Sequence, residues 1–334
     1  MENKTVTLSN LSAKFGTEMR KYAPLMILIG LVILFSIISP RFLTTYNLLI
    51  LVRQVSFAAI SAVGIMFVMI GGGIDLSIGS QIVLTNIVLS IMMAYWQIPP
   101  LLAIPIILVL GTALGMLNGF LAVRLKIHSL IITLGTASIY KGVGYIIANS
   151  RNIMGFPESF RWFGQGYIGP LPVPIAIMIV VALIGSFILT RTYFGRYIFA
   201  MGGNEEAARL AGVNINSMKI VLFAICGFIS AITAVLLLSR VFAGQVSTGQ
   251  GTEFDCLTAA LLGGVSFKGG EGTIFGLMTG ILIIGVLNNA MQLASFPDFS
   301  QNVVKGVVLL AAVGFDMYQK SRKSKETVAR VAAQ

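Results

Sequence analysis

Long apolar runs alternate with short polar segments along almost the whole chain. An α-helix needs about 20 mostly apolar residues to cross about 30 Å of hydrocarbon, and most of these runs are close to that length. The pattern therefore predicts an all-α, polytopic transmembrane helical bundle of about ten spans. We place the spans at residues 23–39, 54–72, 76–95, 101–123, 129–148, 172–190, 218–240, 254–267, 273–293 and 302–319.

Two of these runs are irregular. The eighth, residues 254–267, is short and glycine-rich, which predicts a broken or re-entrant segment. The second and third runs are joined by only Gly71, Gly72 and Gly73, so a bent pair is as consistent with the pattern as two full spans. The predicted division is a cytoplasmic tail at 1–22, a transmembrane domain at 23–319 that includes a long cytoplasmic loop at 191–217, and a basic cytoplasmic tail at 320–334.

Composition supports a membrane environment. Only 10% of the residues are charged, whereas a soluble globular protein carries roughly 25%. The net charge is +11, but Lys and Arg stand singly or gather at the chain ends, without the basic stripe typical of nucleic-acid binding. Cys226 and Cys256 lie in apolar runs without another metal ligand nearby, and His128 follows a basic segment end, so no metal site is predicted.

The distribution of basic residues predicts an orientation. In membrane proteins, Lys and Arg are enriched in cytoplasmic loops. If the N-terminus is cytoplasmic and the chain crosses ten times, most of the 23 Lys and Arg residues fall on the cytoplasmic side. The polar stretch before the first run is long and is followed by no small-residue cleavage site, so we expect an uncleaved first span. The prediction is a multi-pass protein with both termini in the cytoplasm.

The predicted cytoplasmic loop at 191–217 contains a short helix of its own. Asn204 is a favourable N-cap, and Glu205 and Glu206 follow in the first turn, where the helix dipole favours acidic residues. Gly212 supplies a helix stop. From these residues alone, a surface connector and a binding element for a partner are equally supported.

Several motifs in this chain resemble one family. The run from Gly202 to Gly212, Gly-x-Asn-x-x-Ala-Ala-x-x-x-Gly, resembles the coupling loop of ATP-binding-cassette (ABC) importer permeases. Three further stretches are similar to signatures of the ribose-type monosaccharide permeases: residues 73–80 (Gly-Ile-Asp-Leu-Ser-Ile-Gly-Ser), 133–136 (Thr-Leu-Gly-Thr) and 262–273. The resemblance covers about residues 45–320.

The resemblance implies a permease subunit in a bacterial inner membrane. It implies a second permease subunit (an identical copy or a close paralogue), two cytoplasmic ATP-binding subunits or one fused tandem ATPase, and a periplasmic or lipoprotein sugar-binding protein. The residues that would contact the ATPase are Gly203, Asn204, Glu205, Glu206, Ala207, Ala208 and Gly212. The chain has no G-x-x-x-x-G-K-[ST] motif, so ATP and Mg²⁺ are expected on the partner ATPase, and this chain is expected to bind no cofactor itself.

Polar residues inside the spans are the candidate solute pathway, because such residues are costly in a bilayer. Asp75 and Ser77 either cap the third span or line the path. Asn118, Asn288 and Asn289 either contact a neighbouring helix, the favoured interpretation, or bind a sugar hydroxyl. Gln245, Thr248 and Glu253 precede the eighth span and are candidates for an entrance, and Lys141 and Lys305 are expected to reach the outer interface.

The leading hypothesis is therefore the permease of an ATP-driven monosaccharide importer, with a ribose-type cargo. The alternative is a secondary transporter coupled to ions or protons, which would need ionisable groups within the spans. Acidic residues in the spans are nearly limited to Asp75 and Asp255, both near segment ends, and this weakens the alternative. An intramembrane enzyme is disfavoured because H-E-x-x-H and G-x-S-x-G are absent and the chain has one His.

Overall fold

In the computed structural model, the described residues are 23–297, 300–314 and 317, so the predicted tails at 1–22 and 320–334 lie outside them. Within this part of the chain, six helices are long and apolar enough to cross a membrane. They are α3 (Thr45–Ile70), α5 (Pro100–Leu125), α6 (Ser129–Ile147), α8 (Val173–Arg191), α11 (Ile215–Val241) and α13 (Ile274–Leu293). The prediction of an all-α membrane bundle is thus confirmed.

Shorter helices occupy the other predicted spans. Three of them are apolar: α2 (Ala23–Ile38), α4 (Ile78–Ala94) and the helix Ser300–Gly314. The predicted eighth span contains α12 (Thr252–Leu262), which has 11 residues. At a rise of about 1.5 Å per residue it is about 16 Å long, close to half of the hydrocarbon thickness. The apolar helices are therefore of unequal length, and the count of about ten crossings stays a prediction.

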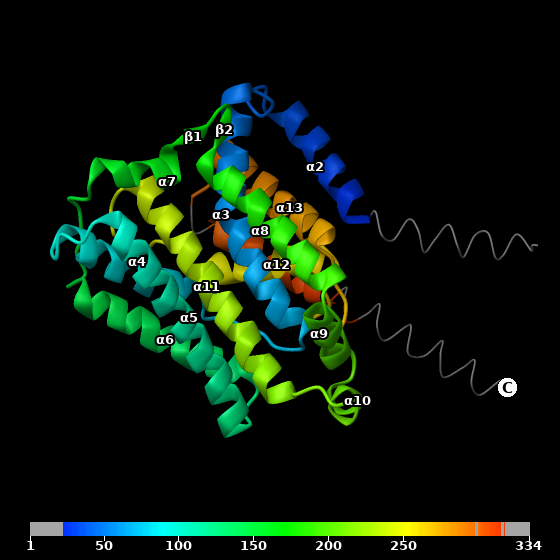
Figure 1. The fold of residues 1–334 in the computed structure, drawn as a ribbon. Helices are drawn as coiled ribbons and strands as arrows, with labels where there is room; N and C mark the ends of the chain where they lie inside the picture. The colour runs from blue at the N-terminus through cyan, green and yellow to red at the C-terminus, as the bar shows by residue number, and fades with distance from the viewer. Residues whose placement is uncertain (1–22, 298–299, 315–316, 318–334) are drawn as a thin grey trace, which may run out of the picture.

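Helices α3 and α11 form the centre of the bundle (Figure 1). Helix α3 packs against α8, α11, α12 and α13, whereas α11 packs most closely against α5. The α5–α11 contact is backbone to backbone, since a β-carbon placed on Gly115 or Gly227 would overlap main-chain atoms of the other helix. Small residues allow this approach in lipid, where the hydrophobic effect does not drive helices together.

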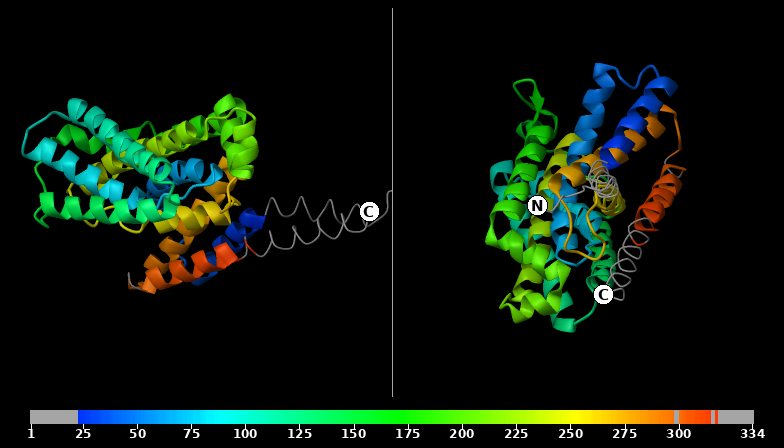
Figure 2. Two further views of the ribbon diagram at one scale, coloured as in Figure 1. Left: turned by 90° about the horizontal axis from the view of Figure 1, so that it is seen from below. Right: turned by 90° about the vertical axis from the view of Figure 1, so that its right-hand side faces the viewer.

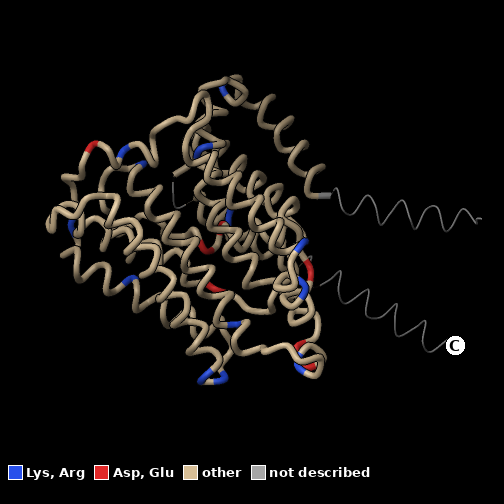
Figure 3. Tube along the Cα trace, viewed as in Figure 1, with Lys and Arg blue, Asp and Glu red and all other residues tan. Residues whose placement is uncertain are grey.

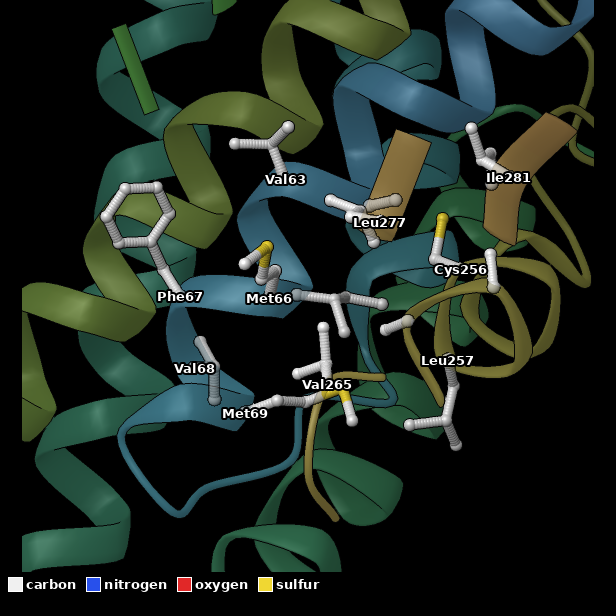
Figure 4. Packing of buried hydrophobic residues seen from close by; sticks show 14 of the residues in the cluster. Val63, Met66, Phe67, Val68, Met69, Cys256, Leu257, Val265, Leu277 and Ile281 are labelled. Atoms are coloured by element: carbon white, nitrogen blue, oxygen red, sulfur yellow. The ribbon is translucent and has the colours of Figure 1, made fainter. Parts of the chain in front are cut away.

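The largest apolar cluster lies where α3, α12 and α13 meet (Figure 4). Met66 and Met69 of α3 are fully buried there beside Leu277 of α13. Val265, in the loop between α12 and α13, closes the same cluster. This packing fixes the short helix α12 against two long helices although α12 cannot span the bilayer by itself.

The two sides of the bundle carry different elements. Helices α4, α5 and α6 lie on one side of α3 and α11, and α2 and α13 lie on the other (Figure 1). Figure 2 shows the helix Ser300–Gly314 on the α2–α13 side. Most Lys, Arg, Asp and Glu positions lie toward the two ends of the bundle, and few lie in its middle (Figure 3), as expected for a membrane protein.

Each end of the bundle has its own small elements. The segment between α6 and α8 forms the 3₁₀ helix η1 (Glu158–Arg161), the one-turn helix α7 (Trp162–Gln165), and a two-stranded hairpin of β1 (Tyr167–Ile168) and β2 (Leu171–Pro172). The opposite end of α8 leads into α9 (Tyr193–Gly203) and α10 (Glu205–Leu210). Helix α3 begins at Thr45, nine residues before the predicted start of that span at 54. Arg53 is therefore inside α3, where it donates a hydrogen bond to Tyr167 Oη at 2.6 Å.

Candidate functional site

The segment between α3 and α4 places an acidic side chain in the interior. Residues 73–77 are not helical, and Asp75 is fully buried there. Its Oδ1 accepts hydrogen bonds from the backbone N–H of Ser77 at 2.8 Å and from Ser77 Oγ at 2.6 Å. Gln81, one turn into α4, donates to Ser77 Oγ at 2.7 Å and to Asp75 Oδ2 at 3.4 Å. The start of α4 is therefore organised by its own polar side chains.

Three other helices complete this polar cluster. Asn118 of α5 donates to Ser77 Oγ at 2.7 Å, and Tyr140 of α6 donates to Asn118 Oδ1 at 3.0 Å. Ser230 of α11 donates to Gln81 Oε1 at 3.1 Å. We call the set Asp75, Ser77, Gln81, Asn118, Tyr140 and Ser230 the Asp75 cluster. All members except Tyr140, at 4%, have no exposed surface, so the cluster links α4, α5, α6 and α11 inside the bundle.

The structure thus brings three of the predicted pathway residues, Asp75, Ser77 and Asn118, into one network. Their hydrogen bonds are made within the protein, which favours a role in holding helices together. Asn289 has a similar environment: it exchanges two amide hydrogen bonds with Asn47, each 2.9 Å long, between α13 and α3. Asn288 is half-buried, and its Oδ1 has no hydrogen-bond partner among the described residues. A place for these residues on the solute path stays a prediction.

The predicted capped helix in the 191–217 loop is present as α10. Asn204 Oδ1 accepts a hydrogen bond from the Ala207 backbone N–H at 2.9 Å, and Gly212 follows the helix with φ of +89°. Glu205 forms ion pairs with Arg209 at 3.1 Å and with Lys219 of α11 at 2.8 Å, which attach α10 to the bundle. Of the predicted ATPase contacts, Ala208 is buried and Glu205 is half-buried, while the exposed ones are Gly203, Asn204, Glu206, Ala207 and Gly212.

A backbone junction connects this loop with α3 and α12. Gly270, in the loop between α12 and α13, donates its N–H to the Ile70 carbonyl oxygen at the end of α3, at 2.8 Å. A β-carbon on Gly202, at the end of α9, would overlap that same carbonyl oxygen. We call this meeting of Ile70, Gly202 and Gly270 the glycine junction. The ends of α3 and α9 and the α12–α13 loop are therefore in direct contact through backbone atoms rather than through flexible side chains.

A cavity lies at the other end of α12. Its volume is about 630 Å³, and we call it the α4–α12 cavity because the first turns of both helices line it. The remaining walls come from α6, the segment before α12 and the helix Ser300–Gly314. The lining residues are Gly79, Ser80, Lys141, Gln250, Gly251, Glu253, Phe254, Asn302, Lys305, Gly306, Leu309 and Leu310.

Charged and polar groups are concentrated in this cavity. Lys305 forms an ion pair with Asp255 of α12 at 2.9 Å, and both side chains are less than one quarter exposed. Gln250 donates to Tyr145 Oη of α6 at 3.2 Å. Glu253 has an Oε2 that is buried and without a hydrogen-bond partner in the described part of the chain. The cavity between the helices therefore has charged and polar groups on its wall beside apolar ones such as Phe254, Leu309 and Leu310.

The sequence had pointed to part of this chamber. Glu253 was expected at an entrance and lines the cavity, whereas Gln245 and Thr248 are not among its lining residues. Lys141 and Lys305, expected at an outer interface, line its walls. The sequence did not predict that Ser80, Gln250 and Asn302 line the cavity. Neighbouring glycines could have indicated two of them, since Gly79 precedes Ser80 and Gly249 and Gly251 flank Gln250.

Metal chemistry has no evident place in the described residues. No group of three His, Cys, Asp or Glu lies close enough there to hold a metal ion. Cys226 and Cys256 are fully buried free cysteines and do not form a disulfide.

Comparison with known proteins decides the family. Residues 47–313 match the family of branched-chain amino acid transport system permease components. This chain belongs to that family. It is 39% identical to the ribose import permease protein RbsC of Haemophilus influenzae over 328 residues, which cover 97% of this chain and 99% of that protein.

Other relatives carry related names. The L-arabinose transport system permease protein AraH of Escherichia coli strain K12 is 39% identical, covering 95% of this chain and 96% of that protein. The ribose import permease protein RbsC of Bacillus subtilis is 38% identical, with coverage of 90% and 94%. No solved structure matches the chain. Membership in this permease family confirms a transport subunit of the ABC type, and the relatives give no support to an ion- or proton-coupled transporter or to an enzyme.

Proposed function

We propose that this chain is the membrane permease of an ABC importer that carries a monosaccharide into a bacterial cell. The observation that carries the proposal is its similarity over nearly the full length to permeases named for ribose and L-arabinose import. Both sugars are neutral pentoses, so a pentose is the proposed cargo and ribose the first one to test. Two permease subunits, two cytoplasmic ATP-binding domains and an external sugar-binding protein form the proposed complex, with Mg-ATP bound by the ATPase.

In this proposal α10 is the contact for the ATPase. Leu210 is 82% exposed, although large apolar side chains on a helix normally pack against a surface. Glu206 and Arg209 are exposed beside it and pair at 3.4 Å. The ion pair between Glu205 and Lys219 would pass the movement of α10 to α11, and the glycine junction would pass it to α3 and α12. The predicted orientation, with both termini in the cytoplasm, would put this face on the ATPase side.

Reconstituted vesicles test the transport proposal. The permease, its ATPase and its binding protein are purified together, and uptake of radiolabelled ribose is measured with ATP inside or outside the vesicles. Uptake should require ATP on the ATPase side, should stop when the phosphate-binding Lys of the ATPase is replaced, and should persist when ionophores collapse ion gradients. Uptake that survives the ATPase substitution and stops with ionophores would contradict the proposal.

The contact proposed for α10 has its own test. Leu210→Asp places a charge on the exposed face without touching the core, so the protein should fold normally but bind the ATPase more weakly and lose uptake. Glu158→Gln, at a 77% exposed side chain on the opposite end of the bundle, is the matched control. If Leu210→Asp binds the ATPase and transports as the unchanged protein does, α10 is a surface connector.

A further inference from the structure

The α4–α12 cavity holds an acidic group whose bonding is incomplete. Oε2 of Glu253 is buried yet accepts no hydrogen bond from any described residue. A buried acceptor without a partner is costly, and native proteins rarely keep one without a reason such as a missing ligand. The other acid of this turn, Asp255, is already paired with Lys305. Glu253 therefore brings to the cavity wall a carboxylate oxygen that has no partner among the described residues.

The position of this carboxyl group depends on a glycine. A β-carbon on Gly79, in the first turn of α4, would overlap Glu253 Oε2. Any other residue at 79 would thus displace the carboxyl group from its place between α4 and α12. The pair is brought together by tertiary folding, since 174 residues separate the two positions.

The remaining lining groups define the chemistry of a ligand. Ser80, Gln250 and Asn302 carry neutral polar groups, and Lys141 supplies a cationic donor. A ligand for this set must donate to a carboxylate and accept from amides and an ammonium group, which a neutral polyhydroxylated molecule does through its hydroxyls. The volume of about 630 Å³ lies within the range of about 300–1,000 Å³ for small-molecule sites.

We propose that the α4–α12 cavity is a sugar-binding station within the permease and that Glu253 is its hydroxyl acceptor. The proposal rests on the proposed import of a monosaccharide and adds where the sugar is held and which side chain selects it. Movement passed through the glycine junction to α12 would change the cavity, because Glu253 stands in the first turn of that 11-residue helix.

The test uses the complete importer in vesicles. Glu253→Ala removes the acceptor and should lower ribose uptake about 10-fold to 100-fold while ATPase binding and folding are kept. Glu253→Gln keeps one acceptor oxygen without the charge, so its ribose uptake should lie between that of Glu253→Ala and that of the unchanged protein. 2-Deoxyribose lacks the hydroxyl group on carbon 2. If Glu253 accepts from that hydroxyl, the ratio of ribose uptake to 2-deoxyribose uptake should be higher in the unchanged protein than in Glu253→Ala. Glu158→Gln is the control and should transport normally.

A second measurement does not depend on uptake. Because both native cysteines are buried, Ser80→Cys introduces one reactive thiol on the cavity wall, and its labelling by a small thiol reagent should slow when ribose is added at high concentration. If ribose gives no protection, and Glu253→Ala imports ribose as the unchanged protein does, the proposal that the cavity binds sugar is wrong, whereas the proposal of sugar import is unaffected. If the unchanged protein imports no sugar with its ATPase, the proposed function itself fails.

Discussion

The Asp75 cluster and the α4–α12 cavity begin from the same kind of sequence and have opposite outcomes. In both, a glycine-rich break is followed by an acidic residue and a short helix: Asp75 precedes α4, and Glu253 stands in the first turn of α12. Asp75 accepts three hydrogen bonds and has no exposed surface, whereas Oε2 of Glu253 accepts none within the described chain.

This difference separates two acids that the sequence alone does not distinguish: one has its hydrogen bonds within the protein, and the other has an oxygen without a partner. Ser77 and Gln81 are near Asp75 in sequence and meet the needs of its carboxyl group, and α5, α6 and α11 then seal the cluster. Glu253 lines a cavity of about 630 Å³, and its Oε2 has no hydrogen-bond partner among the described residues. Among intramembrane acids, the one with incomplete hydrogen bonding is the better candidate for contact with a solute.

The largest expected effect is on the Asp75 cluster. Asp75→Ala leaves the backbone N–H and the hydroxyl of Ser77 without their acceptor in the interior, so it should lower the free energy of unfolding by about 3 kcal/mol or more. Thermal unfolding of the purified protein in detergent measures this. Asp75→Asn, which keeps an acceptor oxygen, is the matched control and should be milder. A stable Asp75→Ala protein that has lost only uptake would place Asp75 on the path.

The glycine junction provides the next effect. Gly202→Ala would push α9 away from the end of α3 and from Gly270, so movement of α10 should reach α12 less well. Uptake per ATP hydrolysed should fall about 3-fold to 30-fold. Gly30→Ala, in α2 and away from the junction and from α10, is the control because a β-carbon there meets nothing within 4 Å. Equal coupling in the two variants would show that the junction does not transmit movement.

The smallest effect concerns the ion pair beside the cavity. Lys305→Met leaves Asp255 partly buried and without its partner, which should cost about 1–3 kcal/mol of stability. A double-mutant cycle with Asp255→Asn should recover part of this loss, because the two groups interact directly at 2.9 Å. Additive effects of the two substitutions would mean that the pair does not hold the helix Ser300–Gly314 against α12.

Features that depend on residues near one another in the sequence could be predicted, whereas features that depend on contacts between distant segments could not. Apolar length predicted the long helices and the short eighth segment, and the local contacts of Asn204 predicted the cap of α10. The start of α3 was placed nine residues late because Arg53 and Gln54 look like a span boundary, whereas Tyr167, from a distant hairpin, binds Arg53. The contact of Gly79 with Glu253 and the pairing of Asp255 with Lys305 arise only in the folded bundle, so the cavity could not be predicted.

The most direct test of the central claim compares two serines on one segment. Ser77→Cys places a thiol in the Asp75 cluster, and Ser80→Cys places one on the cavity wall three residues later. Since access controls thiol labelling, a small water-soluble reagent should modify Ser80→Cys at least about 10-fold faster than Ser77→Cys in the intact importer. Equal rates, or faster labelling of Ser77→Cys, would contradict the account by showing that water and solute reach the Asp75 cluster instead.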